Sequence, residues 1–251
     1  QRITTLEIDL RKLGQNLTYF RSKINESTKV MVMVKAFAYG SGSYEVAHFF
    51  QTRKMVNYLV VAYADEGIVL REKGISLPIM VMSPSKTAYE SMIQHNLEPE
   101  IYSLNTLKDF VRATKSMRHF FDEYPIHLKV DSGMHRLGFA VEQLPEALKI
   151  INEVGFIRVA SVFTHLSATD DEREDDFTRK QIASFSRMNE LIIDGLGYQP
   201  DRHVLNSTGV LRFPEYHFEM VRLGIGLYGF SGSTDSRFLH ALGSLKSYIV
   251  Q

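Results

Sequence analysis

The stretch Val32–Ala47, VMVKAFAYGSGSYEVA, places a lysine at the end of an apolar run and follows it with a tyrosine and two glycines. The residues 29–34, KVMVMV, have the length and β-branched content of a buried strand. Charged side chains are rarely buried without a partner. Lys35 at the strand end therefore calls for a chemical role, and the plain alternative is a lysine that extends its amine to the surface.

Seven further short apolar runs follow, and stretches with helical periodicity separate most of them. We expect strands at 30–34, 58–62, 78–82, 100–102, 126–130, 159–164, 203–205 and 218–221. Helices are expected after caps at Asp9 and Ser103, over 176–196, and before Asn96 with Ser85 or Thr87 as cap. This alternation predicts an α/β fold, a (β/α)8 TIM-type barrel. An open doubly wound sheet is less favoured, because no G-x-G-x-x-G follows the first strand.

Composition narrows the class of ligand. Lys plus Arg and Asp plus Glu are balanced at 29 each, which argues against nucleic acid or an anionic membrane as the main partner. The chain has no cysteine, so no disulfide, thiolate metal site or cysteine nucleophile is expected, and a cytoplasmic location is favoured. No metal site is predicted. No apolar run approaches the roughly 18 residues of a membrane span, and no export signal is evident. We therefore expect a small-molecule site.

A TIM-type barrel carries its site at the carboxyl ends of the strands. The side chains that the predicted strands would deliver there are Lys35, Tyr39, Lys129, Asp131, Arg136, His165, Asn206, Ser207 and Arg222. Gly224 and Ile225 follow the last strand and, with Ser207, fit the phosphate site that such barrels build from backbone N–H groups and a hydroxyl. A lysine across from a phosphate site predicts a Schiff base with pyridoxal phosphate.

Five motifs in order and spacing resemble those of alanine racemase, a barrel-type (fold type III) pyridoxal phosphate enzyme. They are VKAFAYGSG, HLKVDSGMHRLGF, FTHLSATD, LNSTG and VRLGIGLYG, and the resemblance runs from LEIDL over essentially the whole chain. It implies interconversion of L- and D-alanine for peptidoglycan synthesis in a bacterial cell wall. The chain departs from the usual family motif at Phe37, where asparagine is common, and at Ser41, where histidine is common.

The resemblance implies a role for each cofactor-binding candidate. Lys35 should carry the cofactor and act as an acid/base group at the α-carbon. The positions that would hold the phosphate and its surroundings are Tyr39, Asn206, Ser207, Gly224 and Ile225. Arg222 matches an arginine facing the pyridine nitrogen, and His165 matches a residue packed by the ring and hydrogen-bonded to that arginine.

Two further roles concern the substrate. Arg136 matches an arginine near the substrate carboxylate. Lys129 matches a lysine that is often carbamylated and that then orients this arginine. A plain ion pair between Lys129 and Asp131 is the alternative.

The resemblance also implies a domain division, with the barrel over residues 1–240 and the start of a C-terminal β domain over 241–251. SLKSYIVQ, at 244–251, is read as a strand without a partner. In the family the second domain carries a tyrosine that reaches the site of the partner subunit as the opposite-face acid/base group. We therefore expect a homodimer for the full-length protein and poor activity for this chain alone. The resemblance is also compatible with a fusion to a cell-wall ligase.

Two other protein classes share parts of this pattern. A single-domain pyridoxal phosphate homeostasis protein shares the barrel and the lysine, but has no use for Lys129 and Arg136. Barrel-type decarboxylases of basic amino acids place a carboxylate at the pyridine nitrogen, where this chain has Arg222.

Overall fold

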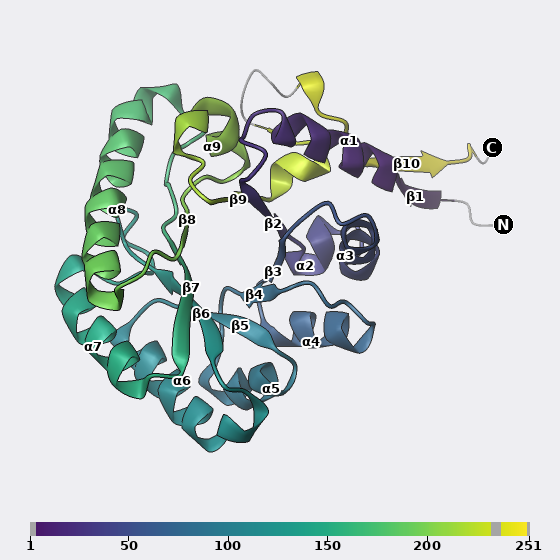
Figure 1. Ribbon diagram of the computed structural model, residues 1–251. Coiled ribbons are helices and arrows are strands. Elements are labelled where there is room, and N and C mark those ends of the chain that lie inside the picture. Colours follow the sequence, from purple (N-terminus) through teal and green to yellow (C-terminus); the bar gives the residue numbers. More distant parts are fainter. Residues whose placement is uncertain (1–3, 232–236, 250–251) are drawn as a thin grey trace.

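The computed structural model describes residues 4–231 and 237–249, which form a parallel barrel ringed by helices (Figure 1). Its eight strands run in the order β8-β7-β6-β5-β4-β3-β2-β9, so strands that follow each other in sequence lie side by side. The N–H of Arg222 in β9 donates to the carbonyl of Leu205 after β8, at 3.0 Å, and this bond joins the two ends of the sheet. The predicted TIM-type barrel is confirmed. No helix in the described ranges has the length and apolarity needed to cross a membrane.

The strands alternate with helices along the chain. The strands are β1 (Thr4–Ile8), β2 (Lys29–Met33), β3 (Tyr58–Val61), β4 (Ile79–Val81), β5 (Leu97–Ile101), β6 (Tyr124–Lys129), β7 (Ile157–Phe163), β8 (Asp201–His203), β9 (Met220–Leu223) and β10 (Gly243–Ser247). The α-helices are α1 (Leu10–Arg21), α2 (Lys35–Tyr39), α3 (Ser43–Thr52), α4 (Ala64–Glu72), α5 (Tyr89–Gln94), α6 (Leu104–Ser116), α7 (Leu144–Val154), α8 (Asp175–Leu196) and α9 (Ser207–Arg212). Short 3-10 turns are η1 (Lys86–Ala88), η2 (Arg118–Phe120), η3 (Val141–Gln143), η4 (Glu172–Glu174), η5 (Pro214–Tyr216) and η6 (Ile225–Tyr228).

Two of the three expected helix caps are confirmed. The Asp9 carboxylate accepts from Arg11 N at 2.9 Å, and the Ser103 hydroxyl accepts from Thr106 N at 3.2 Å. The expected cap at Ser85 or Thr87 is wrong, because η1 intervenes and α5 starts without a side-chain cap. The two hydroxyls lie 3.1 Å apart instead.

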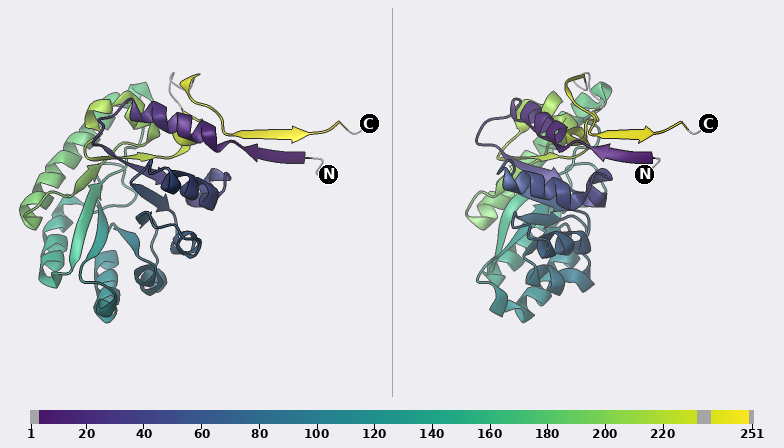
Figure 2. Two further views of the ribbon diagram at one scale, coloured as in Figure 1. Left: turned by 45° about the vertical axis from the view of Figure 1, so that its right-hand side comes forward. Right: turned by 90° about the vertical axis from the view of Figure 1, so that its right-hand side faces the viewer.

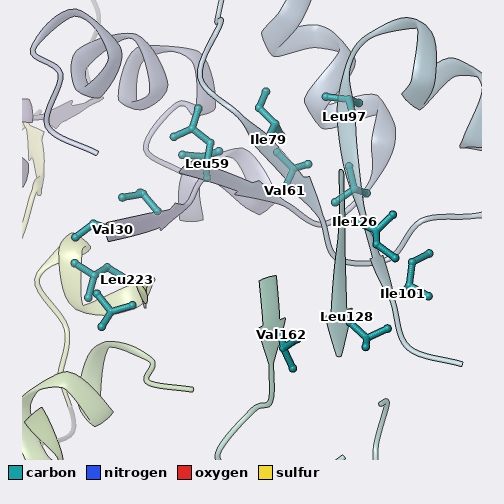
Figure 3. Close-up of a cluster of buried hydrophobic side chains, with 14 of the residues drawn as sticks. Val30, Leu59, Val61, Ile79, Leu97, Ile101, Ile126, Leu128, Val162 and Leu223 are labelled. Atoms are coloured by element: carbon teal, nitrogen blue, oxygen red, sulfur yellow. The ribbon is translucent and has the colours of Figure 1, made fainter. Parts of the chain in front are cut away.

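The main core lies between the barrel strands and the surrounding helices. Alternate residues on each strand face outward, as the two-residue repeat of a strand requires. Figure 3 shows this layer, which includes Val30, Leu59, Val61, Ile79, Leu97, Ile126, Leu128, Val162 and Leu223, all fully buried. Burial of this layer is the main driving force for closing the barrel.

The interior of the barrel is divided into an apolar and a polar half. The inward side chains of β2, β3 and β4 include Met31, Met33, Val60 and Met80, which cluster with Phe163 and Met220. The other strands contribute Phe163 and Met220 to that cluster, but most of their inward side chains are polar or charged: Glu98, Glu100, His127, Lys129, Ser161, His203 and Arg222. Such a barrel is usually filled by branched apolar residues, so this polar half is unusual.

The polar half explains three shifted strand boundaries. The predicted strand 100–102 is β5, Leu97–Ile101, in which Glu98 and Glu100 alternate with outward residues. The predicted strands 203–205 and 218–221 are β8 and β9, displaced by about two residues. A search for apolar runs misses strands whose inward positions are charged and paired across the barrel.

The two ends of the described chain form a separate ribbon. β1 and β10 pair antiparallel in register Thr4↔Ser247 to Ile8↔Gly243 and project away from the barrel (Figure 2). The strand predicted within SLKSYIVQ is confirmed over 244–247, but it has β1 as its partner, so the expectation of an unpaired strand is wrong. Residues 250–251 of that segment lie outside the described part. The domain division at 240/241 stays a prediction.

Candidate active site

A cavity of about 280 Å³ opens at the carboxyl ends of the barrel strands. Its lining brings together every predicted site residue except Lys129 and Asp131: Lys35, Tyr39, Arg136, His165, Asn206, Ser207, Arg222, Gly224 and Ile225, with Met33, Met82 and Thr208. A larger hollow of about 710 Å³ between α1, α3 and β10 is lined by none of them. The smaller cavity is therefore the candidate site, at the end of the barrel where such enzymes carry theirs.

The lysine and the tyrosine of the opening motif are presented by a left-handed turn. Ala36, Phe37, Ala38 and Tyr39 all have φ between 51° and 56°, a conformation that costs each of them roughly 1–2 kcal/mol. The Glu66 carboxylate at the start of α4 holds the turn, accepting from Ala36 N at 2.7 Å and from Ala62 N at 2.7 Å. This unfavourable backbone is therefore anchored from outside its own segment, as expected at a functional site.

Ser207 and two glycines form a compact cradle beside Tyr39. The Ser207 hydroxyl accepts from the N–H groups of Gly224, at 2.9 Å, and Gly226, at 3.3 Å. A Cβ on Gly224 would lie 3.0 Å from the Tyr39 hydroxyl, and one on Gly226 would lie 2.7 Å from the Ser207 Cβ. The hydroxyls can approach the backbone N–H groups here because both glycines lack a side chain. Hydroxyls and N–H groups gathered in this way suit a phosphate.

Asn206 orders the chain next to this cradle. Its carboxamide oxygen accepts from Gly209 N at 2.8 Å and from the Thr169 hydroxyl at 3.0 Å. The first of these bonds caps α9, whose first residue is Ser207. Asn206 therefore places the Ser207 hydroxyl, and direct contact of Asn206 with a cofactor stays a prediction.

Arg222 is almost wholly buried and uses four of its five N–H groups within the protein. Nη1 lies 2.7 Å from His203 Nδ1 and donates to the His203 carbonyl at 2.8 Å. Nη2 donates to the carbonyls of Thr164, at 2.8 Å, and Val204, at 3.3 Å. Since a guanidinium has five donors, only Nε–H lacks an acceptor among the described residues. Burial lowers the pKa of Arg222 to about 10, against the opposing charge of Glu100, so it stays a cation at neutral pH.

Comparison with known proteins shows the family to which the chain belongs. Residues 8–232 match the family model described as alanine racemase, N-terminal domain. The chain belongs to the alanine racemase N-terminal domain family. It is 34% identical over 227 residues to alanine racemase 1 of Oceanobacillus iheyensis, covering 89% of this chain and 59% of that protein. It is 35% identical over 232 residues to the alanine racemase of Thermodesulfovibrio yellowstonii, covering 91% of this chain and 61% of that protein.

A solved structure shares the fold. The alanine racemase of Clostridium difficile 630 superposes with a TM-score of 0.90 at 33% identity, covering 98% of this chain and 65% of that one. The chain spans about three fifths of the length of the two racemases compared by sequence.

His165 lines the site of this racemase-family barrel, but its ring does not bond Arg222. The predicted hydrogen bond between them is wrong: over residues 4–231 and 237–249, Arg222 bonds His203 instead. His203 is the last residue of β8. It was not predicted as a site residue, because the expected strand 203–205 placed it at the start of a strand and not at the carboxyl end. Burial, followed by the charges of Arg222 and Arg136, lowers the pKa of His165 to about 3. His165 is therefore a neutral ring in a strongly positive cavity.

This depressed pKa predicts acid sensitivity. The unfolded chain takes up a proton on this histidine below its ordinary pKa of 6.5, whereas the folded chain does so only near 3. The contribution of His165 to stability is therefore fully present above pH 6.5 and is lost as the pH falls toward 3. Between pH 7 and pH 5 we expect a loss of about 1–2 kcal/mol in the free energy of unfolding. Urea unfolding of wild type and His165→Gln at both values measures it, and an equal loss in the two proteins would contradict it.

Lys129 lies below the cavity, inside the barrel, and is paired with Glu100. Its amine is 2.9 Å from Glu100 Oε1, and both side chains are almost fully buried. The alternative pair with Asp131 is wrong, because that carboxylate accepts from Gly133 N at 2.9 Å and His135 N at 3.0 Å. Glu100 is a site-related residue that sequence reasoning missed, since nothing in the local sequence shows that it faces Lys129.

Arg136 lies on the loop after β6, exposed at the cavity. This loop folds back on itself: Asp131 N donates to the Phe139 carbonyl at 3.0 Å, and Phe139 N donates to the Lys129 carbonyl at 2.9 Å. A Cβ on Gly138, whose φ is +136°, would lie 2.5 Å from Asp131 N, so this close approach requires glycine. Arg136 has no ion pair among the described side chains, and its guanidinium is available to an anionic ligand.

Proposed function

We propose that this chain is the pyridoxal phosphate-binding barrel of an alanine racemase, an isomerase that interconverts L- and D-alanine. One observation carries the proposal. A single cavity at the carboxyl ends of the strands gathers a lysine amine, a cradle of hydroxyls and glycine N–H groups, and a buried arginine with one N–H to spare. These are the groups that an aldehyde, a phosphate and a pyridine nitrogen require of one protein site.

The residues present fit this cofactor. Tyr39, Ser207, Gly224 and Ile225 would bind its phosphate, and the Lys35 amine would bind its aldehyde carbon. Arg222 would donate Nε–H to the ring nitrogen. When bound, the cofactor supplies an electron-withdrawing system that acidifies the α-proton of an attached amino acid. Because Arg222 stays cationic and can only donate, it favours an unprotonated ring nitrogen and so moderates that withdrawal.

The remaining groups would handle the substrate and its proton. Arg136, with its free guanidinium, would bind the carboxylate of alanine as a charge-assisted hydrogen-bond donor. The Lys35 amine, once released from the cofactor, would remove or return the α-proton on one face. Racemisation needs a second group on the other face, for which we propose a tyrosine of another domain and of a partner subunit.

Several finer points stay predictions. They are the homodimer, the low activity of this chain alone, the supply of D-alanine for peptidoglycan, the cytoplasmic location, a fusion to a ligase, and carbamylation of Lys129. Carbamylation of Lys129 would place a second negative charge next to Glu100. The Glu100 carboxyl group would therefore have to be protonated for the carbamate to form.

Reductive trapping tests the proposed function. The chain is incubated with pyridoxal phosphate, reduced with borohydride, digested and mapped by mass spectrometry. We expect one modified lysine, Lys35, and formation of D-alanine from L-alanine by the longer protein that carries this barrel. Modification spread over surface lysines such as Lys12 and Lys149, or none, would contradict it.

The same experiment separates the rival classes. A pyridoxal phosphate carrier would trap the cofactor at Lys35 but leave L-alanine unchanged even in the longer protein. A decarboxylase would release carbon dioxide from a basic amino acid. The cationic group next to the ring site, Arg222, supports neither a decarboxylase nor any enzyme with a carboxylate there.

A further inference from the structure

A continuous line of buried hydrogen bonds leads from Arg222 through the polar half of the barrel. His203 Nδ1 lies 2.7 Å from Arg222 Nη1, and His203 Nε2 lies 2.7 Å from the Ser161 hydroxyl. The same hydroxyl lies 2.7 Å from His127 Nδ1, and His127 Nε2 lies 2.9 Å from Glu98 Oε2. Ser161, His127 and His203 are fully buried, so water does not compete for the first three of these bonds, while the fourth, to Glu98, is partly buried.

The two ends of this line decide the direction of every bond in it. Arginine can only donate, so His203 Nδ1 must accept, and the neutral His203 ring carries its proton on Nε2. Nε2–H then donates to Ser161, whose hydroxyl hydrogen is free to donate to His127 Nδ1. The His127 ring in turn carries its proton on Nε2 and donates it to Glu98, whose carboxylate can only accept.

The alternative protonation of His127 is less favourable. If the His127 ring were a cation, both of its nitrogens would donate, and Ser161 would accept from both histidines at once. Its hydroxyl hydrogen would then lack an acceptor at a position with no exposed surface, which costs the desolvation of a polar group. The one-directional arrangement, with both histidine rings neutral between the Arg222 cation and the Glu98 carboxylate, satisfies each of these groups.

We propose that Glu98, Ser161 and His127 are positioning residues that hold His203 as its Nε2–H tautomer and thereby hold Arg222 in the cavity. The reverse tautomer of His203 would turn Nδ1–H toward Arg222 Nη1, and two donors would face each other at 2.7 Å. We call this line of hydrogen bonds, from Glu98 through His127, Ser161 and His203 to Arg222, the relay. It links the charge of Glu98, in the barrel interior, to the orientation of the Nε–H that Arg222 presents. Its use in setting the ring electronics of the cofactor rests on the proposed function; the relay itself does not.

Nitrogen NMR of the cofactor-free chain tests the relay. In ¹⁵N-histidine-labelled protein we expect both His203 and His127 to be neutral with the proton on Nε2. Glu98→Leu should shift the resonances of His203 and of Arg222 Nε–H, and Glu98→Gln, which keeps an acceptor oxygen, should shift them less. In a Ser161→Ala background the same Glu98 substitutions should leave His203 unmoved, because the connection between them is cut.

A matched control separates coupling from general loosening of the fold. Thr114→Val removes an equally buried hydroxyl, one that donates to helix carbonyls of α6, and should leave His203 and Arg222 unshifted. The proposal is overturned by a His203 proton on Nδ1, by a cationic His127, or by a Glu98→Leu shift at His203 that is absent or independent of Ser161.

A second experiment, with pyridoxal phosphate added, distinguishes the proposed relay from the proposed function. With pyridoxal phosphate added, Ser161→Ala should move the visible absorbance maximum of the bound cofactor, whereas Thr114→Val should not. An unmoved maximum in Ser161→Ala would overturn the link from the relay to the ring. Failure of the wild-type chain to bind the cofactor at all would contradict the proposed function, while the NMR experiment would still decide the relay.

Discussion

Replacing Lys35 by alanine is expected to abolish covalent retention of pyridoxal phosphate and to lower racemisation at least about 10³-fold. Lys35 is the only lysine in the lining of the cavity, among the residues that the structure describes, and its turn is held in place by Glu66. Under the proposed function, the change removes both the amine that attaches the cofactor and the acid/base group of one face. Visible absorbance after dialysis measures the first effect, and a chiral alanine assay measures the second.

Lys29 provides the control from the other end of the same strand. Its amine pairs with Asp201 at 2.6 Å, and Lys29→Ala removes a β2 lysine without touching the cavity. We expect normal cofactor retention in Lys29→Ala and a stability loss of at most about 1 kcal/mol. Retention of the cofactor by Lys35→Ala equal to that of Lys29→Ala would contradict the assignment of Lys35.

Replacing Glu100 by glutamine is expected to destabilise the fold by about 3–5 kcal/mol. Glu100 is the carboxylate that faces Lys129, and its charge also supports the cationic form of Arg222. Without it, two buried cations, Lys129 and Arg222, lie 5.5 Å and 5.1 Å from the centre of the Phe163 ring with no negative partner in contact among the described residues. Domains of this kind are stable by only about 5–15 kcal/mol, so the change should be plain in urea unfolding.

An exposed pair of the same chemistry gives the comparison. Lys108 and Glu146 lie 2.7 Å apart with both side chains about half exposed, so Glu146→Gln should cost less than about 1 kcal/mol. Removing both buried partners, in Glu100→Leu with Lys129→Met, should cost less than Glu100→Leu alone, because no unpaired lysine is left behind. A loss below about 1 kcal/mol in Glu100→Gln would show that the carboxylate is not the required counter-charge.

The outward face of the strands could be predicted because it follows a local rule. Runs such as Val30–Val34 and Val159–Thr164 alternate or accumulate branched apolar residues, and each ends at a polar side chain where the barrel opens. Order along the chain then places Lys35, His165 and Arg222 at the same end of a parallel sheet. The candidate site was readable for the same reason, since its residues directly follow strands.

The inward face could not be predicted in this way. Judged from the neighbouring residues alone, the charges of Glu98 and Glu100 argue against a strand. The barrel can bury them because they pair with His127 and Lys129, about 29 residues further on. Likewise, Arg222 was expected to bond His165 but bonds His203. Nothing in the order of residues states which of two neighbouring histidines a buried guanidinium will face.

Local pattern and the order of motifs were thus enough for the fold class, the family resemblance and the residues around the cavity, because strand alternation and capping act over a few residues. The partners inside the barrel were decided only by tertiary structure. Closing eight strands brings side chains from distant strands within hydrogen-bonding distance, and a buried charge or donor must then take whichever partner that geometry supplies. The left-handed turn of Lys35, held by Glu66 from the next helix but one, has the same origin.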